Sequence, residues 1–182
     1  EHAHASPSFL PDGKSILFTI LITPSARTEL AAMRLADRKI VRLGLMGGSP
    51  FFVDGFLFFS RNDGARGESG HIRTGSADCT AEWSFRRLSF AGQIDLNPDA
   101  FRSGPGNNHL AFQRDDFDIV YLTNSSGSYR GRTFITPGVL PRVTTSQGVI
   151  FVAYRDFRQH PFVAIYRNGG WSGRDLTPGA GL

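Results

Sequence analysis

Short apolar runs rich in Phe, Val, Ile and Tyr alternate with polar turns along the whole chain. Residues 16–18 and 57–59, for example, are bounded by Gly, Asn, Asp, Ser and Pro, which is the pattern of strands joined by tight turns. Asp-Gly and Asn-Gly pairs supply the positive φ that hairpins need. Few stretches keep a helical period for three turns, and residues 28–35 fit either a short helix or an outer strand. The pattern predicts an all-β protein.

The same pattern recurs with a period near 42 residues. The pairs Asp12-Gly13 and Asp54-Gly55 lie 42 residues apart, and residues 127–138 are echoed by residues 170–179. Four marker prolines have gaps of 43, 48 and 43 residues: Pro7, Pro50, Pro98 and Pro141. The longer gap contains the glycine-rich polar stretch 62–75, which we interpret as an extended loop. The approximate repeats are therefore residues 6–48, 49–96, 97–139 and 140–182.

Four strands in forty-odd residues, repeated along the chain, are typical of a β-propeller blade. A β-sandwich would not account for the repeat, and the turn of a β-solenoid is usually shorter. We therefore expect residues 1–182 to form a single β-propeller domain of about four blades, each a four-stranded antiparallel sheet. These blades would either close on themselves or belong to a larger propeller.

Residues 6–19 (SPSFLPDGKSILFT) closely resemble the "SPDGK" repeat of TolB-like and WD40-like propellers, the PD40-type repeat. Residues 152–156 and 166–172 resemble the repeats of sialidase-type or lectin-type propellers, but they lack the Ser-x-Asp-x-Gly-x-x-Trp box of sialidases. Both resemblances imply a propeller, and only the second implies a sugar ligand. The first slightly favours a periplasmic or secreted location. The start of the chain does not resemble a signal peptide, so we expect a cytosolic or an already processed protein.

Composition and charge narrow the classes of partner. The single cysteine, Cys79, excludes an internal disulfide framework and a cysteine-rich zinc module. The longest apolar run, residues 16–22, is too short to cross a bilayer. The net charge is +4 over 182 residues, and the arginines are spread along the chain rather than gathered in one segment. We therefore expect neither a nucleic-acid partner nor a membrane span.

Two sets of side chains are candidates for ligand binding. Arginines followed by polar or acidic residues recur after the second apolar run of a repeat, where guanidinium forks could hold a carboxylate, a phosphate or sugar hydroxyls. Aromatic residues near hairpin turns could stack on a sugar ring. Each set has a structural alternative, because such arginines can tie one blade to the next and such aromatics can pack between blades. The candidates are Arg61, Arg114, Asp115, Tyr129, Arg155, Asp156 and Trp171, with Tyr166 beside them.

Motifs for catalysis and for cofactors are missing. The sequence contains no nucleophile elbow, no Walker loop and no His-Glu-x-x-His helix. His2 and His4 form a His-x-His pair near the start of the chain, where such pairs are usually inert. We therefore predict that the chain is not an enzyme and that it holds no cofactor and no metal.

The leading hypothesis is a non-catalytic module that binds a protein segment or a small ligand at the central channel face. Turn residues at repeat-equivalent positions would crowd together there: Asp12, Asp54, Asn107 and Gln147. The alternative is a carbohydrate-binding propeller with sites between blades, built from Arg114, Arg155, Tyr129 and Trp171. A third reading is the propeller part of a glycosidase or peptidase. An incomplete ring would expose a sheet face and favour a homo-oligomer.

Overall fold

A computed structural model describes residues 2–10, 12–22, 27–53, 55–62, 67–73, 84–88, 95–114, 117–124 and 129–178. In this part of the chain all regular structure is β-strand, and no helix has the length and hydropathy of a membrane span. The chain divides into two compact units, Glu1–Pro98 and Asp99–Leu182. Cys79 lies outside the described residues.

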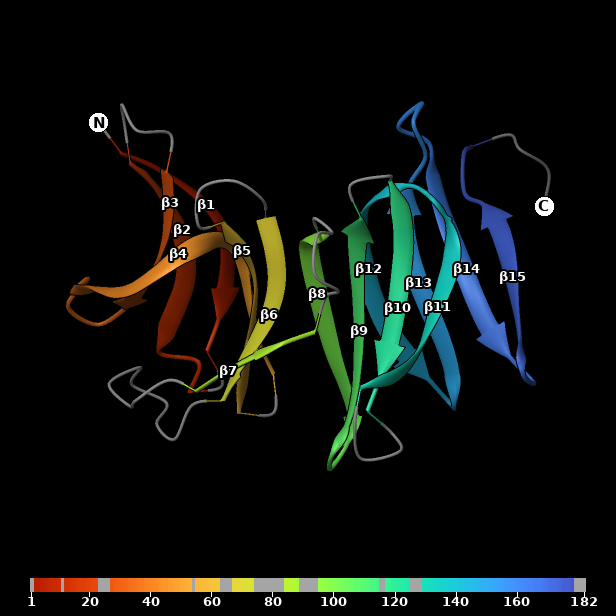
Figure 1. Ribbon diagram of the computed structural model, residues 1–182, viewed down its shortest axis with the longest axis horizontal. Helices are drawn as coiled ribbons and strands as arrows, with labels where there is room; N and C mark the ends of the chain where they lie inside the picture. Colours follow the sequence, from red (N-terminus) through yellow and green to blue (C-terminus); the bar gives the residue numbers. More distant parts are fainter. Residues whose placement is uncertain are drawn as a thin grey trace. The chain divides into compact units, whose positions relative to one another are not determined.

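The first unit is a seven-stranded antiparallel sheet in which the strands follow chain order (Figure 1). Its strands are β1 (His2–Phe9), β2 (Ser15–Ile22), β3 (Arg27–Arg34), β4 (Ile40–Val53), β5 (Phe56–Asn62), β6 (Gly67–Arg73) and β7 (Ser84–Arg87). The long strand β4 pairs with β3 up to Met46 and with β5 from Gly47 onward. It therefore belongs to two four-stranded meanders.

Two regions form strands although the sequence pattern did not predict this clearly: one was ambiguous, and the other was expected to be a loop. The segment that fitted either a helix or a strand is β3, which pairs residue by residue with β2. Part of the stretch 62–75, expected to be an extended loop, is the strand β6. It pairs with β5 from Asn62↔Gly67 to Phe56↔Arg73. The expectation of a loop is wrong there, because hydrogen bonding to a neighbouring strand outweighs a weak local β-propensity.

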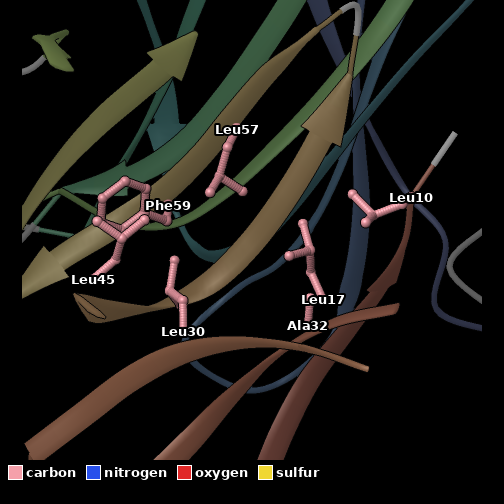
Figure 2. Close-up of a cluster of buried hydrophobic side chains, with 7 residues drawn as sticks. All are labelled: Leu10, Leu17, Leu30, Ala32, Leu45, Leu57 and Phe59. Carbon is pink, nitrogen blue, oxygen red and sulfur yellow. The ribbon is translucent and has the colours of Figure 1, made fainter. Parts of the chain in front are cut away.

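The core of the first unit lies between its two meanders. Figure 2 shows side chains from β2, β3, β4 and β5 pointing toward one another. The cluster consists of Leu10, Leu17, Leu30, Ala32, Leu45, Leu57 and Phe59. Gly47 allows close packing beside this core, because a Cβ at Gly47 would lie 2.4 Å from the carbonyl oxygen of Ser60.

Two four-stranded antiparallel sheets follow along the chain, and all of their strands lie in the second unit except the start of β8, before Asp99. One consists of β8 (Asp95–Gly104), β9 (Asn107–Arg114), β10 (Asp118–Thr123) and β11 (Arg130–Pro137). The other consists of β12 (Val139–Ser146), β13 (Val149–Arg155), β14 (Pro161–Arg167) and β15 (Gly170–Asp175). Their facing side chains form one core: Ala111, Ile119, Tyr121, Val143, Val152, Tyr154 and Ala164.

Backbone conformations repeat at equivalent places along both units. Each turn between the first two strands of a meander has a glycine with positive φ, and these are Gly13 (61°), Gly55 (77°), Gly106 (66°) and Gly148 (76°). The residue before each marker proline is also left-handed, and these are Ser6 (52°), Ser49 (52°), Asn97 (50°) and Leu140 (54°). Three of these prolines coincide with register shifts typical of β-bulges. The sequence period is therefore a period of backbone geometry.

Candidate functional site

A pocket of about 780 Å³ opens between the two sheets of the second unit. Its walls come from the ends of the strands beside the β8–β9, β12–β13 and β14–β15 turns. The lining residues are Phe101, Arg102, Ser103, Asn107, His109, Tyr121, Thr123, Thr145, Gln147, Gly148, Ile150, Tyr166 and Trp171. Aromatic rings and uncharged polar groups dominate this set.

A chain of hydrogen bonds runs along one wall of the pocket. Oγ of Ser103 lies 2.9 Å from Nε2 of His109, and Nδ1 of His109 lies 2.6 Å from the hydroxyl of Tyr121. Nδ2 of Asn107 donates to Oγ of Ser103 at 2.7 Å. Because both nitrogens of His109 are engaged, the Ser103 hydroxyl is held in place from a buried ring.

Burial determines the protonation states of two side chains in this wall, His109 and Tyr121. Desolvation lowers the pKa of His109 below its ordinary value, so the imidazole is neutral at pH 7. Desolvation also raises the pKa of Tyr121 to about 12, which keeps its hydroxyl protonated. The His109 and Tyr121 side chains are therefore both uncharged, and they present hydrogen-bonding groups rather than a charge.

A second wall of the pocket is aromatic. The Trp171 ring lies 5.4 Å from Tyr121, edge-on, and 5.2 Å from Tyr166, measured between ring centroids. Tyr166 and Trp171 are cross-strand partners beside the two-residue turn Asn168-Gly169. Both turn residues have positive φ, 53° and 85°, which is the type I′ geometry that an Asn-Gly pair favours. The turn thus fixes the register that places both rings in the pocket.

One group in the pocket has an unused hydrogen-bonding capacity. Oδ1 of Asn107 is buried and accepts no hydrogen bond within the structure, although Nδ2 of the same side chain is bonded to Ser103. Buried acceptors are usually satisfied, so this oxygen is an exception at a residue that lines the pocket.

Some residues that the sequence pointed to lie at this site. Trp171 and Tyr166 line the pocket, and so do the turn residues Asn107 and Gln147. Tyr129 is half-buried just before β11, at the same end of its sheet, but it is not a lining residue.

The arginine and aspartate candidates lie at the other end of the sheets. Arg114 ends β9 and is only 4% exposed, so it is withdrawn from solvent. Arg155 ends β13, about 17 Å along the strand from Ile150 at the pocket. Asp156 accepts hydrogen bonds from the backbone N–H groups of Arg158 and His160, both at 2.8 Å, and so stabilises a turn. The structure therefore does not bring Arg114 and Arg155 together with Trp171.

Other predicted positions lie elsewhere. Arg61 sits in β5 opposite Gly47, while Asp54 and Asp115 lie outside the described residues. Asp12 belongs to the first unit, where its Oδ1 accepts from the backbone N–H groups of Lys14 and Ser15 and forms the hairpin turn. Among the described residues no group of three or more His, Cys, Asp or Glu side chains could hold a metal ion.

Ser103, His109 and Tyr121 were not predicted from the sequence as site residues. The only local signal was a histidine inside the apolar strand β9. Ser103 and His109 are brought together by the turn at Gly106, and Tyr121 reaches His109 because it lies on the neighbouring strand.

Comparisons with known proteins identify the fold. No family model and no curated protein matches the chain. TolB from Acinetobacter baumannii superposes with a TM-score of 0.66 at 19% identity, covering 94% of this chain and 43% of TolB. A thermostable family-43 glycoside hydrolase gives 0.63 at 11% identity, covering 98% of this chain and 74% of the enzyme. A chain of the nidogen/laminin complex gives 0.56 at 16% identity, with 94% and 64% covered.

These likenesses show that the chain has a β-propeller fold similar to that of TolB, as its SPDGK-like repeat predicts. The chain spans less than half of the TolB chain, so its blades correspond to part of that propeller. The comparisons contradict the prediction that the chain is not an enzyme. It rested on missing motifs, whereas several structures that share this fold are glycoside hydrolases. At 11% and 13% sequence identity, the similarity to these hydrolases shows a shared fold and does not establish an activity for this chain.

Proposed function

We propose that the pocket of the second unit binds a saccharide. The observation that carries the proposal is the combination of an aromatic wall, Tyr166 and Trp171, with a wall of hydroxyl, amide and imidazole groups. A sugar ring has apolar C–H faces and a rim of hydroxyls, so it matches both walls at once. The volume of about 780 Å³ falls within the range of small-molecule sites, roughly 300–1,000 Å³.

Rigidity supports the proposal. Ser103 is held by His109 and Asn107, so less conformational entropy is lost when a ligand hydroxyl binds to it. Asn107 also lines the pocket and fixes the Ser103 hydroxyl through its Nδ2 group. The structural neighbours include proteins described as glycoside hydrolases, and a sugar site on this fold is compatible with that description.

Calorimetric titration with a panel of neutral and acidic oligosaccharides tests the proposal. Trp171→Ala should weaken binding at least about tenfold, because the stacking surface is lost. Phe157→Ala is the matched control, since Phe157 is 60% exposed in a turn at the other end of the sheet and should leave the affinity unchanged.

Trp171 also packs against the core, so a second variant separates binding from folding. Asn107→Ala leaves the aromatic wall intact and should weaken binding about fivefold, the value of one or two hydrogen bonds. If the folded wild-type chain gives no saturable binding with any saccharide of the panel, the proposal fails.

Recognition of a protein segment is the second candidate. Phe117 and Phe157 are 46% and 60% exposed and pack edge-on with ring centroids 5.4 Å apart, which makes an apolar anchor point. Peptides selected on the wild-type chain should lose binding to the double variant Phe117→Ser/Phe157→Ser. Equal binding to both chains would contradict this candidate. A homo-oligomer and a location outside the cytoplasm stay predictions from the sequence.

A further inference from the structure

A serine and a histidine in the pocket are arranged as a nucleophile and its base. Oγ of Ser103 lies 2.9 Å from Nε2 of His109, which is within the range of a hydrogen bond between such a pair. Ser103 is exposed to solvent, whereas His109 is only 6% exposed. A ligand in the pocket can therefore reach the hydroxyl while the protein holds the imidazole behind it.

The hydrogen bonds behind the ring favour the tautomer that such a base needs. The hydroxyl of Thr123 donates to the carbonyl oxygen of Asn108 at 3.1 Å, so Oγ1 of Thr123 accepts in its hydrogen bond with Tyr121. A Tyr121 hydroxyl that donates to Thr123 accepts from Nδ1–H of His109, 2.6 Å away. With the proton on Nδ1, Nε2 of His109 presents an unprotonated lone pair to Ser103.

The single hydroxyl proton of Ser103 has two acceptors within reach. Nε2 of His109 is 2.9 Å from Oγ and the carbonyl oxygen of Asn107 is 3.4 Å away, so the contact with His109 is the stronger one. Nδ2 of Asn107 donates to the same Oγ at 2.7 Å, and the amide has a second N–H that can donate to a developing oxyanion. Burial lowers the pKa of His109, so the neutral imidazole can take the proton at pH 7.

The described lining of the pocket limits the class of reaction. It contains no Asp or Glu, whereas cleavage of a glycosidic bond generally uses a pair of carboxylates. A serine with a neutral imidazole is instead a pair that transfers acyl groups. A sugar ring stacked on Trp171 turns its hydroxyl rim toward the polar wall, so an acyl group on a rim hydroxyl would lie beside Ser103.

We propose that the pocket hydrolyses O-acyl esters of saccharides, with Ser103 as the nucleophile and His109 as the base; the inference rests on the proposed sugar site. Oγ of Ser103 attacks the acyl carbonyl carbon, and its proton passes to Nε2 of His109. The bond between this carbon and the sugar oxygen then breaks, and the sugar oxygen takes the proton from Nε2. Water attacks the acyl-serine and gives a proton to Nε2, and the carboxylic acid leaves as Oγ recovers that proton.

A fluorophosphonate tests the nucleophile without any sugar, because it forms a stable ester with an activated serine. Intact-mass spectrometry should show one added group on the wild-type chain, and peptide mapping should place this group on Ser103. Ser103→Ala should abolish the modification. Ser172→Ala is the matched control, because Ser172 is also exposed but its hydroxyl donates to the carbonyl oxygen of Ile165 at 3.4 Å, so the modification should persist. A wild-type chain that is not modified at Ser103 would overturn the inference.

Two measurements show whether His109 acts as the base. His109→Gln keeps a polar side chain that cannot take the proton, so the folded variant should be modified at least about a hundredfold more slowly. The wild-type rate should rise with pH and level off, with a midpoint below pH 6.5, because His109 is the one described lining residue of a type that titrates between pH 4 and 8. If the variant does not fold, the pH profile decides, and a rate that does not change over this range contradicts the role of His109.

Acetylated saccharides test the substrate class. Chemically O-acetylated members of the saccharide panel should release acetate at least about tenfold faster with the wild-type chain than with Ser103→Ala, measured by ¹H NMR at pH 7. If unacetylated saccharides bind but Ser103 is not modified and no acetate is released, the inference is overturned and the sugar site stands. If Ser103 is modified but no saccharide ester is hydrolysed, the substrate class is wrong. If no saccharide binds, the proposed function fails and the inference fails with it.

Discussion

The hydroxyl of Tyr121 lies 2.6 Å from Nδ1 of His109, and both side chains are about 5% exposed (5% and 6%). The two residues lie on neighbouring strands, β10 and β9, and without Tyr121 the Nδ1 atom of His109 would lose its hydrogen-bond partner. Their contact positions the imidazole whose second nitrogen meets Ser103. The polar wall of the pocket therefore depends on a pair of buried residues behind it.

Tyr121→Phe keeps the ring and removes this bond. His109 then has a buried ring nitrogen without its partner, so the free energy of unfolding should fall by about 1–3 kcal/mol. Urea denaturation measures the change. Tyr166→Phe, which also removes one phenolic hydroxyl at the pocket, should change the stability by less than about 0.5 kcal/mol. Equal stability of the wild type and Tyr121→Phe would contradict the role of the bond.

Gly138 is required by close packing at the start of β12. A Cβ there would lie 2.6 Å from Cδ2 of Tyr154 and 3.0 Å from the carbonyl oxygen of Arg155. Gly138→Ala should therefore destabilise the second unit by about 1–3 kcal/mol. Gly173→Ala is the matched control, because a Cβ at Gly173 meets nothing within 4 Å. If the two variants melt at the same temperature, the packing argument is wrong.

Because Asp99 is buried, we expect the stability of the second unit to depend on pH. Its carboxylate accepts a hydrogen bond from the backbone N–H of Val143 at 2.7 Å, linking β8 to β12. Desolvation by burial raises the pKa of Asp99 to about 6, although the Val143 bond and Arg142 act in the opposite sense. The folded state thus holds a proton more tightly than the unfolded chain does.

The direction in which the free energy of unfolding changes with pH follows from the linkage between proton binding and folding. The stabilisation by protonated Asp99 is fully present below pH 3.8, the ordinary value, and is lost as the pH rises through about 6. Asp99→Asn removes this contribution. Relative to the wild type, its stability should therefore improve between pH 4 and pH 7, by up to about 3 kcal/mol. Denaturant titrations at both pH values measure the difference, and a difference that does not change with pH would refute the shifted pKa.

Much of the fold follows from local chemistry in the sequence. Glycines that must adopt positive φ, such as Gly13 and Gly106, mark the hairpin turns, and their spacing reveals the repeat. The left-handed conformation of Leu140 could not be foreseen, because leucine has no preference for it. The conformation lies at the register shift where β12 pairs with β13, a feature of strand pairing that no local pattern reveals. The strand β6 was missed for the same reason.

The site was only half predictable. Trp171 stood out because an amphipathic ring beside a turn suits a binding site, whereas Ser103 and Tyr121 gave no local signal. The arginines were grouped with Trp171 although strand direction separates them. In an antiparallel meander the end of the second strand, where Arg155 lies, and the start of the fourth, where Trp171 lies, are at opposite ends of the sheet.

An NMR titration of the ¹⁵N-labelled chain with the tightest-binding saccharide of the panel tests the central claim most directly. The claim predicts saturable shifts, with one common dissociation constant, for the indole N–H of Trp171 and for the side-chain amides of Asn107 and Gln147. The backbone amide of Arg158, in the turn at the other end of the sheet, should not move. Saturable shifts confined to that turn or to the first unit, or no saturable shifts at all, would contradict a saccharide site in this pocket.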